Sequence, residues 1–323
     1  MDITRKVEKN QVEKNQSLEK HTEKKRRCKE FVEYMGDKKI KLDRLESCSN
    51  YLLFQTNKDK TKFLLTGGFF CNNRFCPVCS WLKAKKTAFE LLELLKVVQI
   101  MEDKTFVFIT LTVPNVKSSE LKRTIEDMNI SFNRLWKAKE FMSINKGFIR
   151  KLEVTYNKER DDYHPHFHII CCVNKSYFKS KDYLKKRRLL ELWQRATRNN
   201  SITQVDIKPC RMDSVKQVLE LATYSAKQNE LYSSKSVFDG FYEGLFRKKL
   251  LVFNGIFKEY RKKIQDEEIN VDEILELADL KEKTVTEIMY LWDKQDNNYQ
   301  EKKERNLSEC EQKSFYDLKL DVD

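Results

Sequence analysis

Residues 163–170 read YHPHFHII and carry three of the four histidines of this 323-residue chain in strict alternation. An apolar run follows at residues 169–173, so the stretch is predicted to be a strand that enters a core. Because successive side chains of a strand point to opposite faces, His164, His166 and His168 share one face. Imidazoles along one strand face are typical of a metal site, and the alternative is a hydrogen-bonded cluster of surface histidines.

A second strand is predicted just before this one, at residues 148–156, and the two can pair as a hairpin across a polar turn. If Tyr156 faces Tyr163, Glu153 lies directly opposite His166, at a Cβ separation of ~4.5–5.5 Å that suits two ligands of one cation. A register slip of one residue would turn Glu153 to the other face. Imidazole and carboxylate ligands together suit Mn2+, Mg2+ or Zn2+ and leave coordination positions open. The predicted ligands are His166, His168 and Glu153, with His164 as either a further ligand or the start of the strand.

The charge of the chain is strongly asymmetric. The formal net charge is +13, but residues 265–323 contain 8 Lys and Arg against 18 Asp and Glu, a net charge of −10. The first 264 residues therefore carry +23. Such a basic body predicts a polyanionic partner, and nucleic acid is the first candidate. A solvated, lysine-rich surface is the simpler alternative.

The composition excludes several classes of protein. Seven Gly and four Pro rule out a collagen-like or low-complexity chain, and the length allows one large domain or two modest ones. No apolar run approaches the ~20 residues that span a bilayer, and the Lys/Glu-rich start has no signal-peptide core. Nine cysteines in such a chain indicate reduced thiols or metal ligands. We therefore expect a soluble, cytoplasmic protein without a membrane partner.

Three of the nine cysteines have the spacing of a metal-binding turn. Cys71, Cys76 and Cys79 form a Cys-x4-Cys-x2-Cys pattern, with a proline between the last two. Such a turn aims both sulfurs at one metal, as in a zinc knuckle. Cys48 would complete a closed, structural Zn2+ site of four thiolates, although Cys28 could compete for its place. The alternative is a set of buried free thiols.

The apolar periodicities predict an α+β fold, with a central antiparallel sheet, flanking helices and a small N-terminal zinc-binding module. From residue 104 onward the order of elements is β-α-β-β-α-β-α. The expected strands are 106–113, 148–156, 163–173 and 202–208, with a short hairpin at 51–55 and 63–70, and the expected helices are 81–102, 118–141, 179–197 and 215–228. The predicted parts of the chain are a mobile or loosely helical arm (1–45), the cysteine-rich module with a helix (46–103), the α+β domain (104–264) and an acidic helical tail (265–323).

One predicted helix, residues 215–228, brings further reactive side chains together. Glu220, Tyr224 and Lys227 are spaced by four and then three residues, so they lie on one helical face. A tyrosine on a helix is ordinarily part of the core or of the surface. The spacing alone therefore indicates a shared face and not a reaction.

Several ordered motifs resemble those of a known family, the rolling-circle replication initiators of small bacterial plasmids. These initiators are one branch of the His-hydrophobic-His (HUH) endonuclease superfamily. The resemblance covers roughly residues 45–265 and implies an RRM-like HUH endonuclease domain of the single-tyrosine type. The matching segments are 108–115 (FITLTVPN), 164–168 (HPHFH), 205–209 (VDIKP) with Glu220-x3-Tyr224-x2-Lys227, and the cysteine segment 71–79 followed by Trp81.

The resemblance implies a site- and strand-specific DNA nicking endonuclease and strand transferase. Tyr224 would attack a DNA phosphate held by Mn2+ or Mg2+ at the histidine site, leaving a 5′-phosphotyrosyl link and a 3′-OH primer. Lys227 would stabilise the phenolate or the phosphate, because a phenol with a pKa near ~10 needs help at neutral pH. Glu220 would activate the water that ends the reaction. Thr223 departs from the family pattern, since many relatives have Lys there, which puts one contact to DNA in doubt.

The same resemblance implies the partners. They are plasmid origin DNA, single-stranded at the nick, and the host helicase and DNA polymerase, while a homodimer stays open. Specific recognition would combine lysines and arginines on phosphates with a few side chains on bases. The candidate DNA-binding residues are Lys185, Lys186, Arg187, Arg188 and Lys208.

Two other functions fit the same residues. One is another single-tyrosine nuclease, such as a transposase or a mobilisation relaxase, although in relaxases the tyrosine normally precedes the histidine motif and Tyr224 follows it. The other is a non-catalytic, zinc-containing DNA-binding regulator whose histidines bind metal structurally. Such a regulator would have no requirement for Tyr224.

Overall fold

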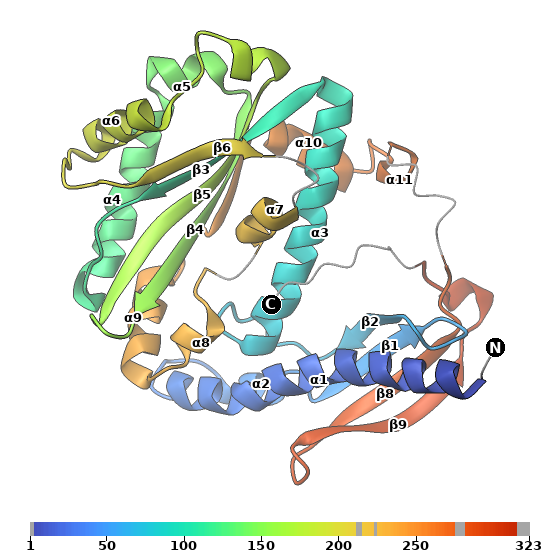
Figure 1. Ribbon diagram of the computed structural model, residues 1–323. Coiled ribbons are helices and arrows are strands. Elements are labelled where there is room, and N and C mark those ends of the chain that lie inside the picture. The colour runs from blue at the N-terminus through green and yellow to red at the C-terminus, as the bar shows by residue number, and fades with distance from the viewer. Residues whose placement is uncertain (1–2, 211–214, 223–224, 275–281, 315–323) are drawn as a thin grey trace. The chain divides into compact units, whose positions relative to one another are not determined.

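The computed structural model describes residues 3–210, 215–222, 225–274 and 282–314. The chain divides into two compact units, both of which can be followed in Figure 1. The first unit joins residues 1–83 to residues 277–319, and the second contains residues 84–276. No helix in the described part of the chain is both long enough and apolar enough to cross a membrane.

The first unit is built on a four-stranded antiparallel sheet in the order β2-β1-β8-β9. Its core consists of side chains from three of these strands, Leu52, Phe54, Ile288, Tyr290 and Tyr299. The elements of this unit are α1 (Ile3–Met35), α2 (Leu42–Glu46), β1 (Tyr51–Thr56), β2 (Phe63–Gly68), the start of α3 (Pro77–Glu102), β8 (Thr286–Asp293), β9 (Asn298–Asn306) and the 3-10 turn η3 (Glu309–Glu311).

The C-terminal segment differs from the acidic helical tail predicted for residues 265–323. Strands β8 and β9 form a hairpin, and β8 pairs with β1, with Phe54 opposite Ile288. Ile288 and Tyr290 alternate with more exposed residues and point into the core, which is the pattern of a half-buried strand. The acidic residues of the segment lie largely on its exposed positions. The acidic charge of this segment indicates which of its residues are exposed, and it does not indicate a helix.

Helix α1 occupies most of the arm that was predicted to be mobile or loosely helical. In its C-terminal half, Cys28, Phe31 and Met35 recur at helical spacing and are buried. His21 lies edge-on to Phe54 of β1, with 5.3 Å between ring centroids. Few apolar residues carry this pattern, which explains why it was not recognised in a stretch dominated by Lys, Glu and Gln.

The second unit contains a five-stranded antiparallel sheet in the order β6-β3-β5-β4-β7. The predicted fold class, an α+β fold with antiparallel strands and flanking helices, is confirmed. Besides the rest of α3, the elements are β3 (Lys104–Thr112), α4 (Ser118–Trp136), α5 (Lys139–Ile144), β4 (Gly147–Asn157), β5 (Asp162–Asn174), the 3-10 turn η1 (Lys175–Lys179), α6 (Lys186–Thr197), β6 (Val205–Cys210), α7 (Val215–Ala222), α8 (Gln228–Leu231), α9 (Lys235–Leu245), β7 (Leu251–Gly255), α10 (Ile256–Gln265) and α11 (Val271–Ile274).

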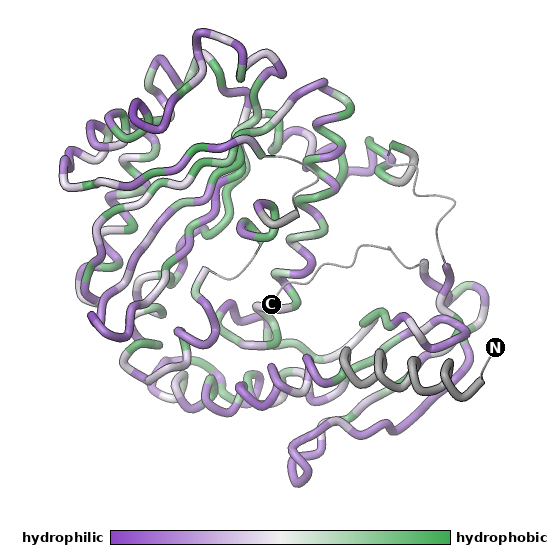
Figure 2. Tube along the Cα trace, in the orientation of Figure 1, coloured by the Kyte–Doolittle hydropathy of each residue, from purple (hydrophilic) through white to green (hydrophobic). Residues whose placement is uncertain are grey.

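Helices cover both faces of this sheet. On one face, Phe108 and Ile170 belong to a buried cluster with residues of α3, α7 and α10. On the other face, Phe132 of α4 contacts Phe167 of β5, with 5.7 Å between ring centroids. Figure 2 shows hydrophobic residues concentrated along the strands of this sheet and along α3. Burial on both faces explains why residues 169–173 form a continuous apolar run.

Some predicted helices are shorter in the structure. The helix expected at 118–141 is broken after Trp136 and continues as the separate helix α5. The helix expected at 179–197 begins only at Lys186. Within the described residues, α7 ends at Ala222, so the helix expected to continue to residue 228 does not include Lys227, whose backbone is extended.

Candidate metal site and cysteine cluster

The β4–β5 hairpin brings two histidines and a glutamate together on one face of the second unit's sheet. Its register pairs Tyr156 with Tyr163 and Glu153 with His166, as predicted. The Glu153 Oε2 atom lies 3.1 Å from Nε2 of His168 and 3.5 Å from Nε2 of His166. One ligand atom from each residue lies within 4.8 Å of the other two. This group, Glu153 with His166 and His168, is called the metal triad below.

The metal triad is largely shielded from solvent. The His166 side chain is 11% exposed, and those of His168 and Glu153 are each 12% exposed. Burial alone raises the pKa of the Glu153 carboxyl, but hydrogen bonds with His166 and His168 outweigh it and hold the pKa at about 2. The carboxylate is therefore charged at neutral pH. Two imidazole nitrogens and a carboxylate oxygen aimed at one point can hold a divalent cation.

The remaining ring nitrogen of each triad histidine has a neighbour that orients it. Nδ1 of His166 lies 3.1 Å from the backbone oxygen of His164. Nδ1 of His168 lies 3.3 Å from Oγ1 of Thr110, its cross-strand neighbour on β3. When Nδ1 carries the proton, the lone pair of Nε2 is free for a metal. In the sequence, nothing but its place in an alternating strand marks Thr110 as a neighbour of His168.

His164 lies outside the metal triad. Its ring centroid is 5.4 Å from that of His166, and the described residues that group as metal ligands here do not include it. Burial lowers the pKa of His164, and the electrostatic interaction with His166 adds to that effect. Of the two roles predicted for His164, the start of the strand fits the structure better than a further ligand.

Helix α7 brings Glu220 to the same site. The Glu220 Oε2 atom lies 3.9 Å from Nδ1 of His168. Tyr224 lies outside the described residues. The next residue, Ser225, accepts a hydrogen bond through its backbone oxygen from the amide of Val154, at 2.7 Å. Lys227 does not lie on the helix that carries Glu220, because a new helix, α8, begins just after it. Its Nζ atom lies 3.9 Å from the carboxylate of Glu230.

Lys151 is a buried cation that sequence reasoning missed. It precedes Glu153 by two residues on β4, so both side chains leave the same face of the sheet. Its register partner on β5 is His168, and it is 8% exposed. The available signal was a lysine two residues before Glu153, on the predicted face of the metal ligands.

The predicted DNA-binding residues lie at the start of α6 and on β6, and all are exposed. Acidic side chains accompany four of the five: Arg188 Nη2 is 2.5 Å from Glu140, Arg187 Nε is 3.4 Å from Glu191, and the Nζ atoms of Lys186 and Lys208 are 4.0 and 3.9 Å from Asp206. Part of the charge at the start of α6 is therefore engaged within the protein. The residues concerned are Lys185, Lys186, Arg187, Arg188 and Lys208.

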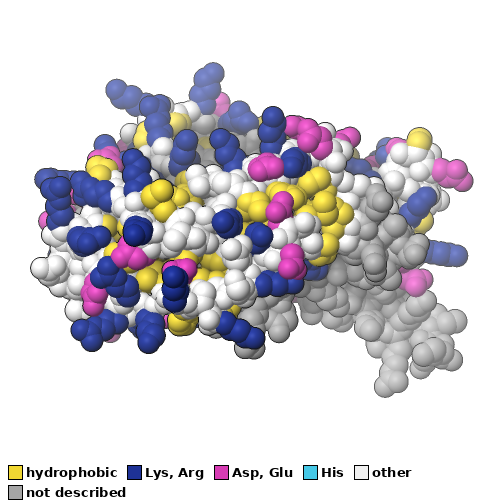
Figure 3. All heavy atoms as spheres, turned by 90° about the horizontal axis from the view of Figure 1, so that it is seen from above, with side chains coloured by type: hydrophobic (Ala, Val, Ile, Leu, Met, Phe, Trp, Pro, Cys, Tyr) yellow, Lys and Arg dark blue, Asp and Glu magenta, His cyan; other side chains and the backbone are white. Residues whose placement is uncertain are grey.

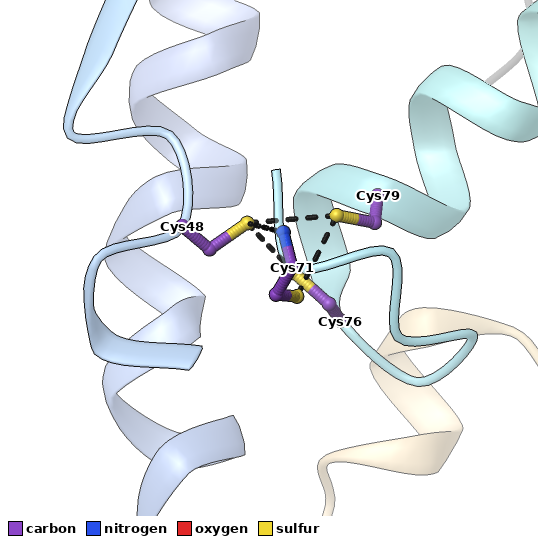
Figure 4. A group of neighbouring side chains, drawn as sticks. All are labelled: Cys48, Cys71, Cys76 and Cys79. Atoms are coloured by element: carbon purple, nitrogen blue, oxygen red, sulfur yellow. Dashed lines mark hydrogen bonds between the residues drawn. The ribbon is translucent and has the colours of Figure 1, made fainter. Parts of the chain in front are cut away.

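A four-cysteine cluster lies in the first unit, and its four side chains are drawn in Figure 4. Cys48 follows α2, Cys71 and Cys76 lie in the loop before α3, and Cys79 lies in the first turn of α3. The sulfur of Cys48 is 3.6 Å from that of Cys76 and 3.5 Å from that of Cys79, and the sulfur of Cys71 is 3.6 Å from that of Cys79. Cys28 lies 4.0 Å from Cys76 but is not part of the group.

Two thiols of this cluster, Cys71 and Cys79, have a pKa below the ordinary value, chiefly because of a hydrogen bond with Cys48. Hydrogen bonds with Cys48, and then with Cys76 and Cys79, lower the pKa of Cys71. A thiolate, and not a thiol, is the form that binds metal. Four sulfurs at these distances can surround a single ion.

Lys25 of α1 places a positive charge beside the cysteine cluster. It is 6% exposed, and its Nζ donates to the backbone oxygen of Cys48 at 2.5 Å and to Asn50 Oδ1 at 2.8 Å. Burial lowers the pKa of Lys25, while electrostatic interactions with the neighbouring cysteines Cys28, Cys48 and Cys76 oppose this shift. A buried ammonium here offsets thiolate charge. The basic run around it gave no sign of burial in the sequence.

Comparison with known proteins identifies the family. The family model Rep_1, described as replication protein, matches residues 62–300 and so extends beyond residue 265 into β8 and β9. "Protein rep" of Staphylococcus aureus is 42% identical over 225 residues, which are 68% of this chain and 97% of that protein. "Protein rep" of Streptococcus pneumoniae serotype 2 is 30% identical over 279 residues, or 82% and 85% of the two chains. No solved structure matches. The chain therefore belongs to the Rep_1 family of replication proteins.

Proposed function

We propose that this replication protein initiates rolling-circle replication of a plasmid by nicking one strand of its origin. The observation that carries the proposal is the metal triad, a buried set of two imidazoles and a carboxylate next to helix α7. A replication protein with such a site has the means to hold a DNA phosphate at a fixed point. The 3′-OH made by the nick would be the primer for a host polymerase, once a host helicase separates the strands.

Tyr224 is proposed as the nucleophile. Its oxygen would form a bond to phosphorus while the bond from phosphorus to the 3′ oxygen breaks, and the 3′ oxygen would take up a proton as the phenol loses one. Ser225, which follows Tyr224 in the chain, is hydrogen-bonded to Val154, which follows the triad residue Glu153. This contact supports a reaction at the triad.

Mn2+ or Mg2+ is the proposed ion at the metal triad. A bound divalent ion would polarise the scissile phosphate and offset the charge that develops on its oxygens. Lys151, buried on the same face as Glu153, would add a second positive charge near that phosphate. Lys227, three residues after the tyrosine in the sequence, would stabilise the phenolate or the phosphate.

Glu220 is proposed to act at the end of the cycle. Its carboxylate lies beside His168 and would accept a proton from the water that hydrolyses the tyrosyl link. This role uses a carboxylate on the side of α7 that faces His168.

Zn2+ is proposed for the four-cysteine cluster. A tetrahedral zinc with Zn–S bonds of ~2.3 Å places its sulfurs about 3.8 Å apart. The sulfur separations of 3.5 and 3.6 Å in the cluster are close to this value. All four ligands come from the protein, so the site is closed and structural.

Replacing Thr110 by Val is expected to weaken Mn2+ binding about 10-fold, because His168 loses the hydroxyl that orients its ring. Titration of the protein with Mn2+ would measure the affinity. Thr112→Val is the matched control: Thr112 faces His166 across the strands, but its hydroxyl donates to the backbone oxygen of Gln204. Equal Mn2+ affinities of the two variants would contradict the orienting role of Thr110.

A nicking assay tests the proposed function. Purified protein in metal-free buffer is mixed with a supercoiled plasmid that carries the cognate origin, and Mn2+ or Mg2+ is then added. We expect nicked circles only when both the divalent ion and the origin are present, because the metal triad is needed to hold the phosphate. A plasmid with a scrambled origin is the control. Equal nicking of both plasmids, or nicking without added metal, would contradict the proposal.

A further inference from the structure

A small cleft in the second unit is lined by three arginines. It has a volume of about 210 Å³ and lies between α4 and the C-terminal end of α6. Arg134 comes from α4, and Arg195 and Arg198 come from the end of α6. The remaining lining residues are Leu135, Ala138, Leu192 and Ala196. In the left half of the picture in Figure 3, many Lys and Arg side chains lie on the surface, with hydrophobic side chains between them.

The three arginines of this cleft differ from those at the start of the same helix. Within the described ranges, no carboxylate forms an ion pair with Arg134, Arg195 or Arg198, whereas Arg187 and Arg188 are both paired with Glu191. The one polar contact found for the cleft arginines' side chains is from Arg134 Nη1 to the backbone oxygen of Ala196, at 3.1 Å. Three like charges around one cleft repel one another, and an anion between them would relieve that repulsion.

Arg198 occupies a backbone position that favours another residue. It ends α6 in the left-handed conformation, with φ of 57° and ψ of 33°. Glycine or asparagine adopts this conformation at helix ends more readily than a residue with a long side chain. From this position Arg198 lines the cleft.

Helix α6, which lines this cleft, is hydrogen-bonded to strand β3, which pairs with the strand of the triad histidines. Nε1 of Trp193 in α6 donates to the backbone oxygen of Thr112 at 2.7 Å, and Thr112 is the register partner of His166. A ligand held at the end of α6 is thus held by an element tied to the strand beside the triad.

We propose that Arg134, Arg195 and Arg198 form a binding site for phosphate groups of the DNA backbone. A guanidinium is planar and donates two parallel hydrogen bonds to a phosphate, and this contact carries no sequence information. The site holds duplex DNA while another phosphate of the same DNA is cut at the triad, so the proposal rests on DNA being the substrate. We therefore place the main contact with the DNA backbone at the C-terminal end of α6, and not at the start of this helix, where it was predicted from the sequence.

The test compares single variants that each remove one positive charge. Arg134→Ala, Arg195→Ala and Arg198→Gly remove the cleft arginines one at a time. Arg123→Ala is the matched control, because Arg123 also lies on α4, is 88% exposed and is accompanied by Asp127. Affinity for a short origin duplex and for a scrambled duplex is measured over a range of salt concentrations, without added divalent metal. Under these conditions no strand is cut, so the result does not depend on nicking.

We expect each cleft variant to reduce the slope of log affinity against log salt by about 0.9, with Arg123→Ala close to the parent protein. Binding to both duplexes should weaken by the same factor. Arg198→Gly should melt at the same temperature as the parent or higher, since glycine suits the left-handed position. A cleft variant with an unchanged slope, or one that weakens origin binding alone, would overturn the proposal. Loss of nicking by the parent protein would instead contradict the proposed function and leave this site unaffected.

Discussion

Tyr224→Phe is expected to lower the rate of origin nicking by a factor of about 10⁴ or more, with origin binding unchanged. The substitution removes only the oxygen that is proposed to bond to phosphorus, and losing a nucleophile costs far more than losing an orienting group. Nicked circles are counted over time on the supercoiled origin plasmid in Mn2+. Affinity for the same origin DNA is measured in parallel, so that a folding defect would be detected.

Tyr183→Phe is the control for this experiment. Tyr183 is 40% exposed and lies in the second unit, before α6 and outside the metal triad. It should nick like the parent protein. Nicking by Tyr224→Phe within about tenfold of the parent rate would contradict the assignment and would favour direct attack by water, with Glu220 as its base.

Removing the metal from the four-cysteine cluster is expected to unfold the first unit. Structural zinc contributes roughly 10 kcal/mol or more to folding, which is comparable with the whole stability of a typical domain. Without the ion, Lys25 would lie buried beside thiols that no longer carry compensating charge. Cys76→Ser should therefore lower the zinc content from about one ion per chain to near zero and abolish the cooperative melting of this unit, followed by circular dichroism.

Two cysteine variants serve as controls. Cys310 is exposed and outside the cluster, so Cys310→Ser should leave zinc content and melting unchanged. Cys28→Ser separates the two cysteines that compete in the sequence, because Cys28 is near Cys76 but not in the cluster. Full zinc content in Cys28→Ser is expected. Zinc lost with Cys28 and kept without Cys48 would contradict the ligand set.

The metal triad was largely predictable because local rules determine it. A short polar turn joins two strands, and pairing Tyr156 with Tyr163 leaves one register in which Glu153 faces His166. Strand alternation then places His168 on the same face. Glu220 lies beside the triad, but the helical spacing placed Lys227 on the wrong element, since it gave no sign that a new helix would begin at Gln228.

The features that were missed depend on contacts between distant parts of the chain. Strands β1 and β8 pair although more than two hundred residues separate them in the sequence, and no local pattern in the acidic segment indicates that it pairs with β1. Lys25 and Lys151 are both buried cations within runs of ordinary surface or strand character. Their burial depends on which other elements of the fold pack against them. The hydropathy pattern along the chain does not contain this information.

Locating the covalent link between protein and DNA tests the central claim most directly. The protein is incubated with a single-stranded origin oligonucleotide and Mn2+, digested with trypsin and analysed by mass spectrometry. Trypsin releases residues 217–227, QVLELATYSAK, a peptide with a single tyrosine. Our account predicts that this peptide carries the 5′ end of the cleaved DNA on Tyr224. An adduct on another residue, or cleaved DNA with a free 5′-phosphate and no adduct at any time point, would contradict it.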